Sequence, residues 1–326
     1  MILLAKKNIL SIVVLLIVVS LLLCGCEQQE TSSPQKQPTE ITLPTRESKI
    51  PITAVKITPQ ADVSPPKSLS SEYQQPVPLL APINTAGAED SPFILPDGNT
   101  LYFFFTPDVK VPVEKQLLDR VTGIYTSKKQ NGKWSEPERV ILQDKNKLSL
   151  EGCEFVQDNK IWFCSAREGY EGIHWFTAEF KNSKWQNWKN ADFKQDYKVG
   201  ELHFTKDGNT VYFHSERPGG KGGLDLWTST KVNNIWQEPI NLETVNTASS
   251  EGWPALNPDE TELWLYKDYG LWRSKKINNA WSKPELMISP LAGEASIDNV
   301  GNVYFVHHYY KDNQMLEADI YLAQKK

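Results

Sequence analysis

The feature that most constrains the fold is a pattern of four short strands that recurs along most of the chain. Residues 200–242 give its clearest copy, GELHFTKDGNTVYFHSERPGGKGGLDLWTSTKVNNIWQEPINL. The Asp-Gly turn at 207–210 separates two alternating apolar runs and predicts a hairpin. A Gly-rich loop and a polar Lys-Val-Asn-Asn turn delimit two further strands. Four such strands make one sheet that is too small to be stable alone, so the pattern must be repeated or covered.

Weaker copies of the pattern lie before and after this stretch. Five versions of the first hairpin can be aligned, and they begin at Ser91, Cys153, Leu202, Pro254 and Ala295. A third strand follows each hairpin, and a fourth strand with a tryptophan follows in four of them. These residues are Trp134, Trp185, Trp236 and Trp281. A repeat of about 50 residues with four strands per unit predicts a β-propeller.

The missing fourth strand of the last unit is expected from the other end of the folded region. The fifth copy ends at Lys326 after its third strand, and residues 73–85 align with residues 236–247. Pairing of these ends would remove two exposed sheet edges. The sequence therefore predicts an all-β, five-bladed β-propeller of four-stranded antiparallel blades over residues 71–326, with the ring closed by the N-terminal strand.

The N-terminus has the organisation of an export signal. Lys6 and Lys7 precede an apolar run at 9–23, which is shorter than the roughly 20 residues that span a bilayer. The following Leu-Cys-Gly-Cys resembles the lipobox of prokaryotic lipoproteins. The resemblance implies that residues 1–25 form a signal peptide and that Cys26 is lipidated. Plain secretion and an uncleaved anchor remain alternatives. The folded part is expected outside the cytoplasm, anchored to the membrane by lipid.

Residues 26–70 differ from the rest of the chain in composition. They are rich in Gln, Glu, Thr, Ser, Pro and Lys and almost free of aromatic residues. Such a segment buries too little apolar surface to offset its ordering entropy, so it is predicted to be a disordered tether. The net charge of −5 argues against a nucleic-acid partner, which requires a basic surface.

The third copy carries a recognisable signature. It has Lys-Asp-Gly at 206–208, Ser215 and Arg217, a Gly-rich loop at 219–222, Asp225-Leu-Trp227 and a Trp-x-x-Pro at 236–239. This pattern resembles the WD40-like repeats of TolB-type propellers. The second copy lacks the aspartate before its third strand, and the fifth lacks the Pro-Asp of the first turn. The resemblance implies the propeller fold and a binding or scaffolding role, and little specific chemistry.

Each predicted blade begins with an acidic residue beside its first strand. These residues are Asp90, Glu151, Glu201, Glu251 and Glu294. First strands line the channel of a propeller, so the carboxylates are expected to surround one mouth, where Arg167 and Arg217 also emerge. One interpretation is structural, because a repeated residue often fixes a turn or pairs with a neighbouring arginine. The other is a ligand site for a cation or a sugar. Ca²⁺ would suit oxygen ligands, but no calcium-loop motif is present, and no cofactor or metal site is predicted.

A catalytic alternative uses the first three of these acids. The layout resembles five-bladed glycoside hydrolases of the arabinanase type, and the resemblance implies that Asp90, Glu151 and Glu201 act as base, modulator and acid. Because the fourth and fifth copies carry similar acids, these three are not distinctive. We therefore expect binding rather than catalysis.

Two long connections should lie on the same face as the acids. They are residues 106–122, with one or two helical turns, and residues 307–318, which begin with His307 and His308. Long loops on a rigid repeat often carry binding, so Arg167, Arg217, Glu251, Glu294 and the two histidines are predicted to bind a ligand.

Cys153 and Cys164 flank the second hairpin. A two-residue turn at 158–159 places them opposite one another, and a three-residue turn shifts them by one, so a disulfide is one of two outcomes. The sequence as a whole predicts a monomeric, membrane-anchored binding or scaffold module for a protein, a peptide or a cell-surface glycan.

Overall fold

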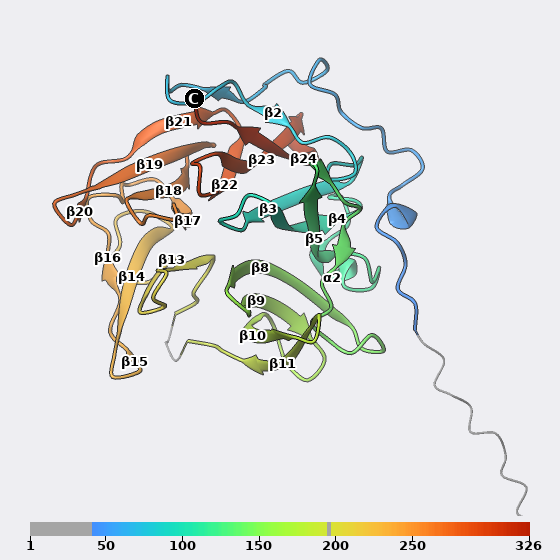
Figure 1. Cartoon of the computed structure of the whole chain (residues 1–326), viewed down its shortest axis with the longest axis horizontal. Helices are drawn as coiled ribbons and strands as arrows, with labels where there is room; N and C mark the ends of the chain where they lie inside the picture. The colour runs from blue at the N-terminus through green and yellow to red at the C-terminus, as the bar shows by residue number, and fades with distance from the viewer. Residues whose placement is uncertain (1–40, 194–196) are drawn as a thin grey trace, which may run out of the picture. The chain divides into compact units, whose positions relative to one another are not determined.

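A computed structural model describes residues 41–193 and 197–326 (Figure 1). The predicted signal peptide, Cys26 and the first part of the predicted tether lie outside the described residues. Within the described part, no helix is both long and apolar enough to cross a membrane. Helix is confined there to a short 3₁₀ turn, η2 (Glu47–Lys49), and one turn of α-helix, α2 (Val113–Gln116). The remaining elements are strands, so the all-β prediction is confirmed.

The strands follow the repeat that the sequence predicted. Before the first repeat come β1 (Lys67–Ser68) and β2 (Val77–Pro78). The first repeat consists of β3 (Ala88–Ile94), β4 (Thr100–Thr106), β5 (Gly123–Gln130), β6 (Lys133–Trp134) and β7 (Glu138–Arg139). The second consists of β8 (Ser149–Gln157), β9 (Lys160–Arg167), β10 (His174–Lys181) and β11 (Lys184–Asn190). The third consists of β12 (Leu202–Phe204), β13 (Thr210–Ser215), β14 (Asp225–Val232), β15 (Ile235–Trp236) and β16 (Ile240–Asn241).

The last two repeats complete the described chain. The fourth consists of β17 (Glu251–Leu256), β18 (Glu262–Lys267), β19 (Gly270–Ile277), β20 (Ala280–Trp281) and β21 (Glu285–Ser289). The fifth consists of β22 (Ala292–Ile297), β23 (Val303–Lys311) and β24 (Gln314–Ala323). Within each repeat the first three strands pair antiparallel in order. The strands that follow pair with the third strand. The fifth and first repeats share one sheet only through a single parallel residue pair, Ala318 with Ala88.

The first strands of the repeats lie against one another. β3 contacts β8, β8 contacts β12, β12 contacts β17, β17 contacts β22, and β22 contacts β3. In Figure 1 the labels β3, β8, β17 and β22 accordingly lie nearest the middle of the sheets. The elements that carry the candidate site are therefore neighbours in space although they are far apart in sequence.

Apolar clusters fill the spaces between successive sheets. Each cluster combines residues from two repeats, as Phe163 and Phe176 of the second repeat do with Tyr102 and Ile124 of the first. Another cluster joins Tyr304 of the fifth repeat to Phe103 of the first. A buried aromatic side chain contributes about 1.5–3 kcal/mol by leaving water, so these clusters hold the sheets face to face.

The N-terminal segment pairs with the C-terminal strand. β2 lies antiparallel to β24, with Val77 opposite Leu322, and Tyr73 bridges to Lys325. The sequence alignment of residues 73–85 with a fourth strand predicted this pairing. The side-chain amide of Asn84 reinforces it by donating to the Ile320 carbonyl at 2.9 Å.

The predicted disordered tether differs from the structure over residues 46–68. Arg46 is buried and donates to the Ile83 carbonyl at 2.8 Å. Asp62 bonds to the His307 ring at 2.9 Å, and β1 pairs with β21. The composition of this segment is poor in apolar residues, but its few charged side chains find buried partners on the sheets. The prediction of disorder is therefore wrong for this strap.

The two predicted long connections have different outcomes. The first contains the single turn α2, as expected from its sequence. The second is not a loop, because residues 307–318 belong mostly to a long β23–β24 hairpin in which His307 pairs with Asp319. The run His-His-Tyr-Tyr is part of strand β23, so its successive side chains point to opposite faces of the sheet.

Candidate functional site

The candidate site is a cavity where the first strands of all five repeats meet. It is a small cavity of about 50 Å³ that opens to solvent. Its lining comes from β3, β8, β12, β17 and β22 and the residue before β12. The lining side chains include Ser91, Glu154, Glu201, Trp253 and Glu294. This cavity lies among the first strands, as the prediction of a channel requires, but its residues are only partly those that the sequence singled out.

Bulges in the first strands bring these side chains to the cavity. Four of the five first strands carry one extra residue relative to the second strand. The extra residue has a positive φ of 47° at Ser91, 56° at Cys153, 51° at Trp253 and 54° at Glu294. A positive φ is unfavourable for these residue types, and such bulges redirect side chains near functional sites. Four occurrences around one cavity make it the best-supported site in the structure.

Three glutamates face the cavity with little compensation from cations. Burial raises the pKa of Glu154 well above its ordinary value, and the charges of Glu201 and Asp90 add to the shift. Burial, with the charge of Asp90, raises the pKa of Glu201 to about 7. Burial and the neighbouring acids also raise the pKa of Glu294 well above its ordinary value. A cavity of acids that hold their protons near neutral pH is poised to change charge when a ligand enters.

Asp90 behaves differently from the glutamates. Burial raises the pKa of its carboxyl, but the His308 ring, 3.5 Å away, and the Ser91 N–H outweigh that effect, so the pKa lies below its ordinary value. His308 is therefore near the site, as predicted. The site thus combines one carboxyl that ionises easily with three that resist ionisation.

The five acids that the sequence treated as equivalent occupy different register positions. Glu151 and Glu251 lie two residues before the bulged residue, whereas Glu294 is itself the bulged residue. Glu151 is buried between Arg139 at 2.7 Å and Arg167 at 3.6 Å. Glu201 and Glu294 line the cavity, whereas Glu151 and Glu251 do not, and Asp90 lies beside the lining residue Ser91. The predicted mouth of five equivalent carboxylates is therefore wrong.

Glu251 and Glu89 make the same hydrogen bonds, each to the threonine four residues before it. Glu251 accepts a hydrogen bond from the backbone N–H of Thr247 at 3.0 Å, and Glu89 accepts one from the N–H of Thr85 at 2.9 Å. Each glutamate also accepts from the hydroxyl of the same threonine. Both side chains are fully buried. A motif Asn-Thr-x-x-x-Glu, present at 84–89 and 246–251, therefore fixes the corner between one repeat and the next.

The two arginines predicted to bind ligand are buried in their blades. Arg167 donates to the Leu142 carbonyl at 3.1 Å and stacks on Phe176 at 4.1 Å. Arg217 is 9% exposed and stacks over Phe213 and Trp227, each at 5.3 Å. Both therefore act as parts of the inter-sheet packing, and the prediction that they face a ligand is not supported by their burial.

His307 is also engaged inside the fold. Its ring is fully buried, bonded to Asp62 and to the Leu291 carbonyl. Strand alternation explains the difference from His308, because neighbouring residues in a strand point to opposite sides. Of the two adjacent histidines, only His308 is directed toward the acids.

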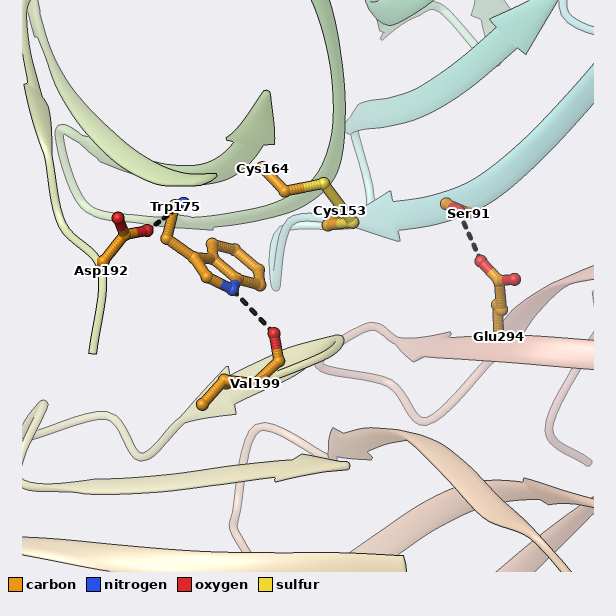
Figure 2. The surroundings of a disulfide bond; sticks show 7 residues. All are labelled: Ser91, Cys153, Cys164, Trp175, Asp192, Val199 and Glu294. Carbon is orange, nitrogen blue, oxygen red and sulfur yellow. Dashed lines mark hydrogen bonds between the residues drawn. A yellow bond between two sulfur atoms is a disulfide. The ribbon is translucent and has the colours of Figure 1, made fainter. Parts of the chain in front are cut away.

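Cys153 and Cys164 form a disulfide, with their Cα atoms 5.5 Å apart. The turn at 158–159 has two residues, but the bulge shifts the register so that Cys164 lies opposite Gly152. Figure 2 shows the disulfide together with Ser91 of β3, which donates a hydrogen bond to Glu294 of β22. The disulfide joins the strand that carries Glu154 to its neighbour.

The most informative site residues are those that sequence reasoning missed. Glu154 directly follows a predicted turn-flanking cysteine and was aligned as an ordinary strand residue. Glu154 lies next to the bulged residue of its strand, and Trp253 and Ser91 are themselves bulged residues. The repeat alignment does not reveal these bulges. The sequence carries no signal for these bulges, because the one-residue excess of the first strand over the second appears only in the strand pairing. Among the residues that the structure describes, no three His, Cys, Asp or Glu side chains are close enough together to hold a metal ion.

No protein-family model matches the chain, and no curated protein matches it significantly. Solved structures with a similar fold include TolB from Acinetobacter baumannii, with 13% identity and a TM-score of 0.42 over 74% of this chain. This chain spans 56% of that TolB chain. The endo-arabinase of Bacteroides thetaiotaomicron has 12% identity and a TM-score of 0.48 over 75% of this chain and 96% of that one.

The gluconolactonase XC5397 of Xanthomonas campestris has 11% identity and a TM-score of 0.45 over 80% of this chain and 95% of that one. All three are propeller proteins. Because their identities and TM-scores are low, none of them carries an argument about this chain's function.

Proposed function

We propose that this chain is an exported five-bladed β-propeller that binds a ligand in the cavity among its first strands. The succession of contacts from β3 through β22 and back to β3 supports five blades in a ring. The pairing of β2 with β24 supports closure by the N-terminal strand. The ligand is a protein, a peptide or a cell-surface glycan, and the propeller acts as a monomer.

One observation carries the assignment of the site to the cavity. Glu154 is 7% exposed and lines the cavity, and neither of its carboxylate oxygens has a hydrogen-bond partner among the described residues. A buried carboxyl without a partner costs free energy in the ligand-free protein. A ligand that bonds to it would remove that cost, which makes the cavity the best candidate for binding.

The location outside the cytoplasm is part of the proposal. The lipobox-like Leu-Cys-Gly-Cys supports lipidation at Cys26, and the Cys153–Cys164 disulfide suits an oxidising compartment. Metabolic labelling with a fatty acid tests the anchor. Label in the wild type and none in Cys26→Ser is the expected result, and equal labelling of both would contradict it.

A binding screen tests the site. The full chain in detergent is applied to glycan and peptide arrays beside the variants Glu154→Gln and Glu136→Gln. Glu136 is exposed and lies away from the cavity lining, so it is the matched control. Ligands should be captured by the wild type and the control and weakly by Glu154→Gln. Capture that is equal on all three proteins would refute the cavity as the site.

A glycoside hydrolase is the second candidate, and a specific observation favours it. Asp90 has a lowered pKa and Glu201 a raised one of about 7, and such a divergence is typical of a base and an acid in one active site. Glu151, the third acid of the predicted trio, does not fit because two arginines hold it. Aryl-glycosides with Asp90→Asn and Glu201→Gln as controls test this candidate. Hydrolysis that survives both substitutions would exclude it.

A further inference from the structure

We propose that the cavity holds the positively charged group of an organic ligand, a primary ammonium or a guanidinium. This inference rests on the proposed binding function and names the ligand class of the same site. It follows from four properties of the cavity. These are the excess of carboxyl groups over cationic groups, the absence of a hydrogen bond to Glu154, the spacing of the acids, and the aromatic residues along one side.

Carboxyl groups outnumber cationic groups in and beside the cavity. Four acids interact with one another there, namely Asp90, Glu154, Glu201 and Glu294. None of the described lining residues is a lysine or an arginine. His308 faces Asp90, and burial lowers the pKa of the His203 ring to about 3, so His203 is neutral. The only nearby group able to carry a positive charge among these residues is therefore His308, against four carboxyls.

Glu154 identifies the place that the cation would occupy. Its carboxyl is more than nine-tenths buried, and neither oxygen makes a hydrogen bond within the described residues. Its own backbone N–H offsets part of the rise in its pKa and does not prevent it. In contrast, Glu294 accepts from Ser91, and Glu151 outside the cavity is held by arginines. A buried carboxyl is well compensated by a charged N–H donor, because charge-assisted hydrogen bonds are about twice as strong as neutral ones.

The spacing of the acids favours an organic cation over a metal ion. A metal ion requires its ligands to converge on one point at about 2.0–2.6 Å. In the described parts of the chain no three His, Cys, Asp or Glu side chains converge in this way. An ammonium has three N–H donors and a guanidinium has five, directed outward. Such groups can reach carboxyls that lie on different strands.

Aromatic residues supply a further element suited to a cation. Trp253 lines the cavity, and its ring packs edge-to-face on Tyr266 with centroids 5.2 Å apart. Tyr269 continues this row at 6.4 Å from Tyr266 and is 61% exposed. The faces of Trp and Tyr rings attract ammonium and guanidinium groups. The row therefore runs from the exposed Tyr269 to Trp253 in the cavity lining.

Isothermal titration calorimetry of the full chain in detergent at pH 8 tests the proposal. The probes are putrescine and agmatine, which carry ammonium and guanidinium groups, and 1,4-butanediol, a neutral molecule of similar length to putrescine. Gly-Lys-Gly and Gly-Arg-Gly distinguish a peptide source from a free amine. Ca²⁺ serves as the metal control. We expect at least one cationic probe to bind, the diol not to bind, and Glu154→Gln to weaken binding by about 10- to 100-fold.

Three controls keep the result interpretable. Glu136→Gln should retain wild-type affinity, and circular dichroism should show that Glu154→Gln is folded. Binding should strengthen between pH 6 and pH 8, because a cation competes with the protons held by Glu154, Glu201 and Glu294. The other titratable groups that face these acids or the cavity lining are Asp90, Tyr102, His203, His214, His308 and Tyr310.

Several outcomes would overturn the inference. The inference is wrong if the diol binds as tightly as putrescine. It is also wrong if Ca²⁺ alone binds, or if none of the cationic probes binds. If neutral glycans from the array bind in a Glu154-dependent manner while the cations fail, the cation class is refuted and the proposed binding function survives. If no ligand of any class depends on Glu154, both are refuted.

Discussion

Replacement of Glu201 by glutamine should stabilise the protein at alkaline pH and not at acid pH. Glu201 faces the cavity directly before β12, and burial raises its pKa from 4.5 to about 7. Glutamine has nearly the same shape and no proton to lose. The variant therefore isolates the free energy of placing this charge in the cavity.

The magnitude follows from the size of the pKa shift. Below pH 4.5 the carboxyl is protonated in the folded and the unfolded chain and costs nothing. Between pH 4.5 and 7 only the unfolded chain releases the proton, so the free energy of unfolding falls as pH rises. Each pKa unit corresponds to about 1.4 kcal/mol, so the full effect approaches about 3 kcal/mol above pH 7. Removing the charge also relieves Glu294, whose pKa the charge of Glu201 raises, and this adds to the effect in the same direction.

Urea unfolding followed by tryptophan fluorescence measures the effect, since the chain has eleven tryptophans. The free energies of unfolding of the wild type and Glu201→Gln are compared from pH 4 to pH 8.5. The difference should be near zero at pH 4 and grow to a gain of about 3 kcal/mol for the variant above pH 7. Glu136→Gln should show no such slope. A difference between wild type and Glu201→Gln that does not change with pH would refute the reasoning.

Three further substitutions test the parts that hold the site in place. Arg46→Ala should lower the free energy of unfolding by about 2–4 kcal/mol, because charged donors to two buried backbone carbonyls are lost; an unchanged urea midpoint would show that the strap is dispensable. Cys153→Ser should cost about 3 kcal/mol under non-reducing conditions, as expected for a bridge across a sequence separation of 11. Detection of two free thiols by mass spectrometry in the wild type purified under non-reducing conditions would rule the bridge out. Glu151→Ala should cost about 3–5 kcal/mol in urea unfolding, because two arginines lose their buried partner, and a neutral effect would mean that water replaces the carboxylate.

The architecture was predictable from sequence because it depends on local patterns that recur. Asp-Gly turns, alternating apolar runs and the spaced tryptophans predicted the all-β class and the antiparallel order of the strands. The predicted four strands per sheet occur in one sheet of the described chain, and the others have five, six and nine. The alignment of residues 73–85 with 236–247 also predicted that β2 pairs with β24. The strap at 46–68 was missed because its order depends on a few long-range contacts, such as Arg46 with the Ile83 carbonyl, and not on its own composition.

The site was less predictable because bulges shift the register without changing residue type. Alignment placed Glu151 and Glu294 at the same position, but only Glu294 occupies a bulge and faces the cavity. Glu154 had no distinguishing pattern at all. Its importance depends on burial and on missing partners, and both are properties of the assembled strands.

Infrared difference spectroscopy of Glu154 tests the central claim most directly. The claim is that the first strands hold this carboxyl without a partner until a cationic ligand arrives. At pH 7 the ligand-free protein should show the carbonyl band of a protonated carboxyl that is absent from Glu154→Gln. Saturation with agmatine should remove that band. A Glu154 that is already ionised without ligand, or a band that agmatine leaves unchanged, would contradict the account.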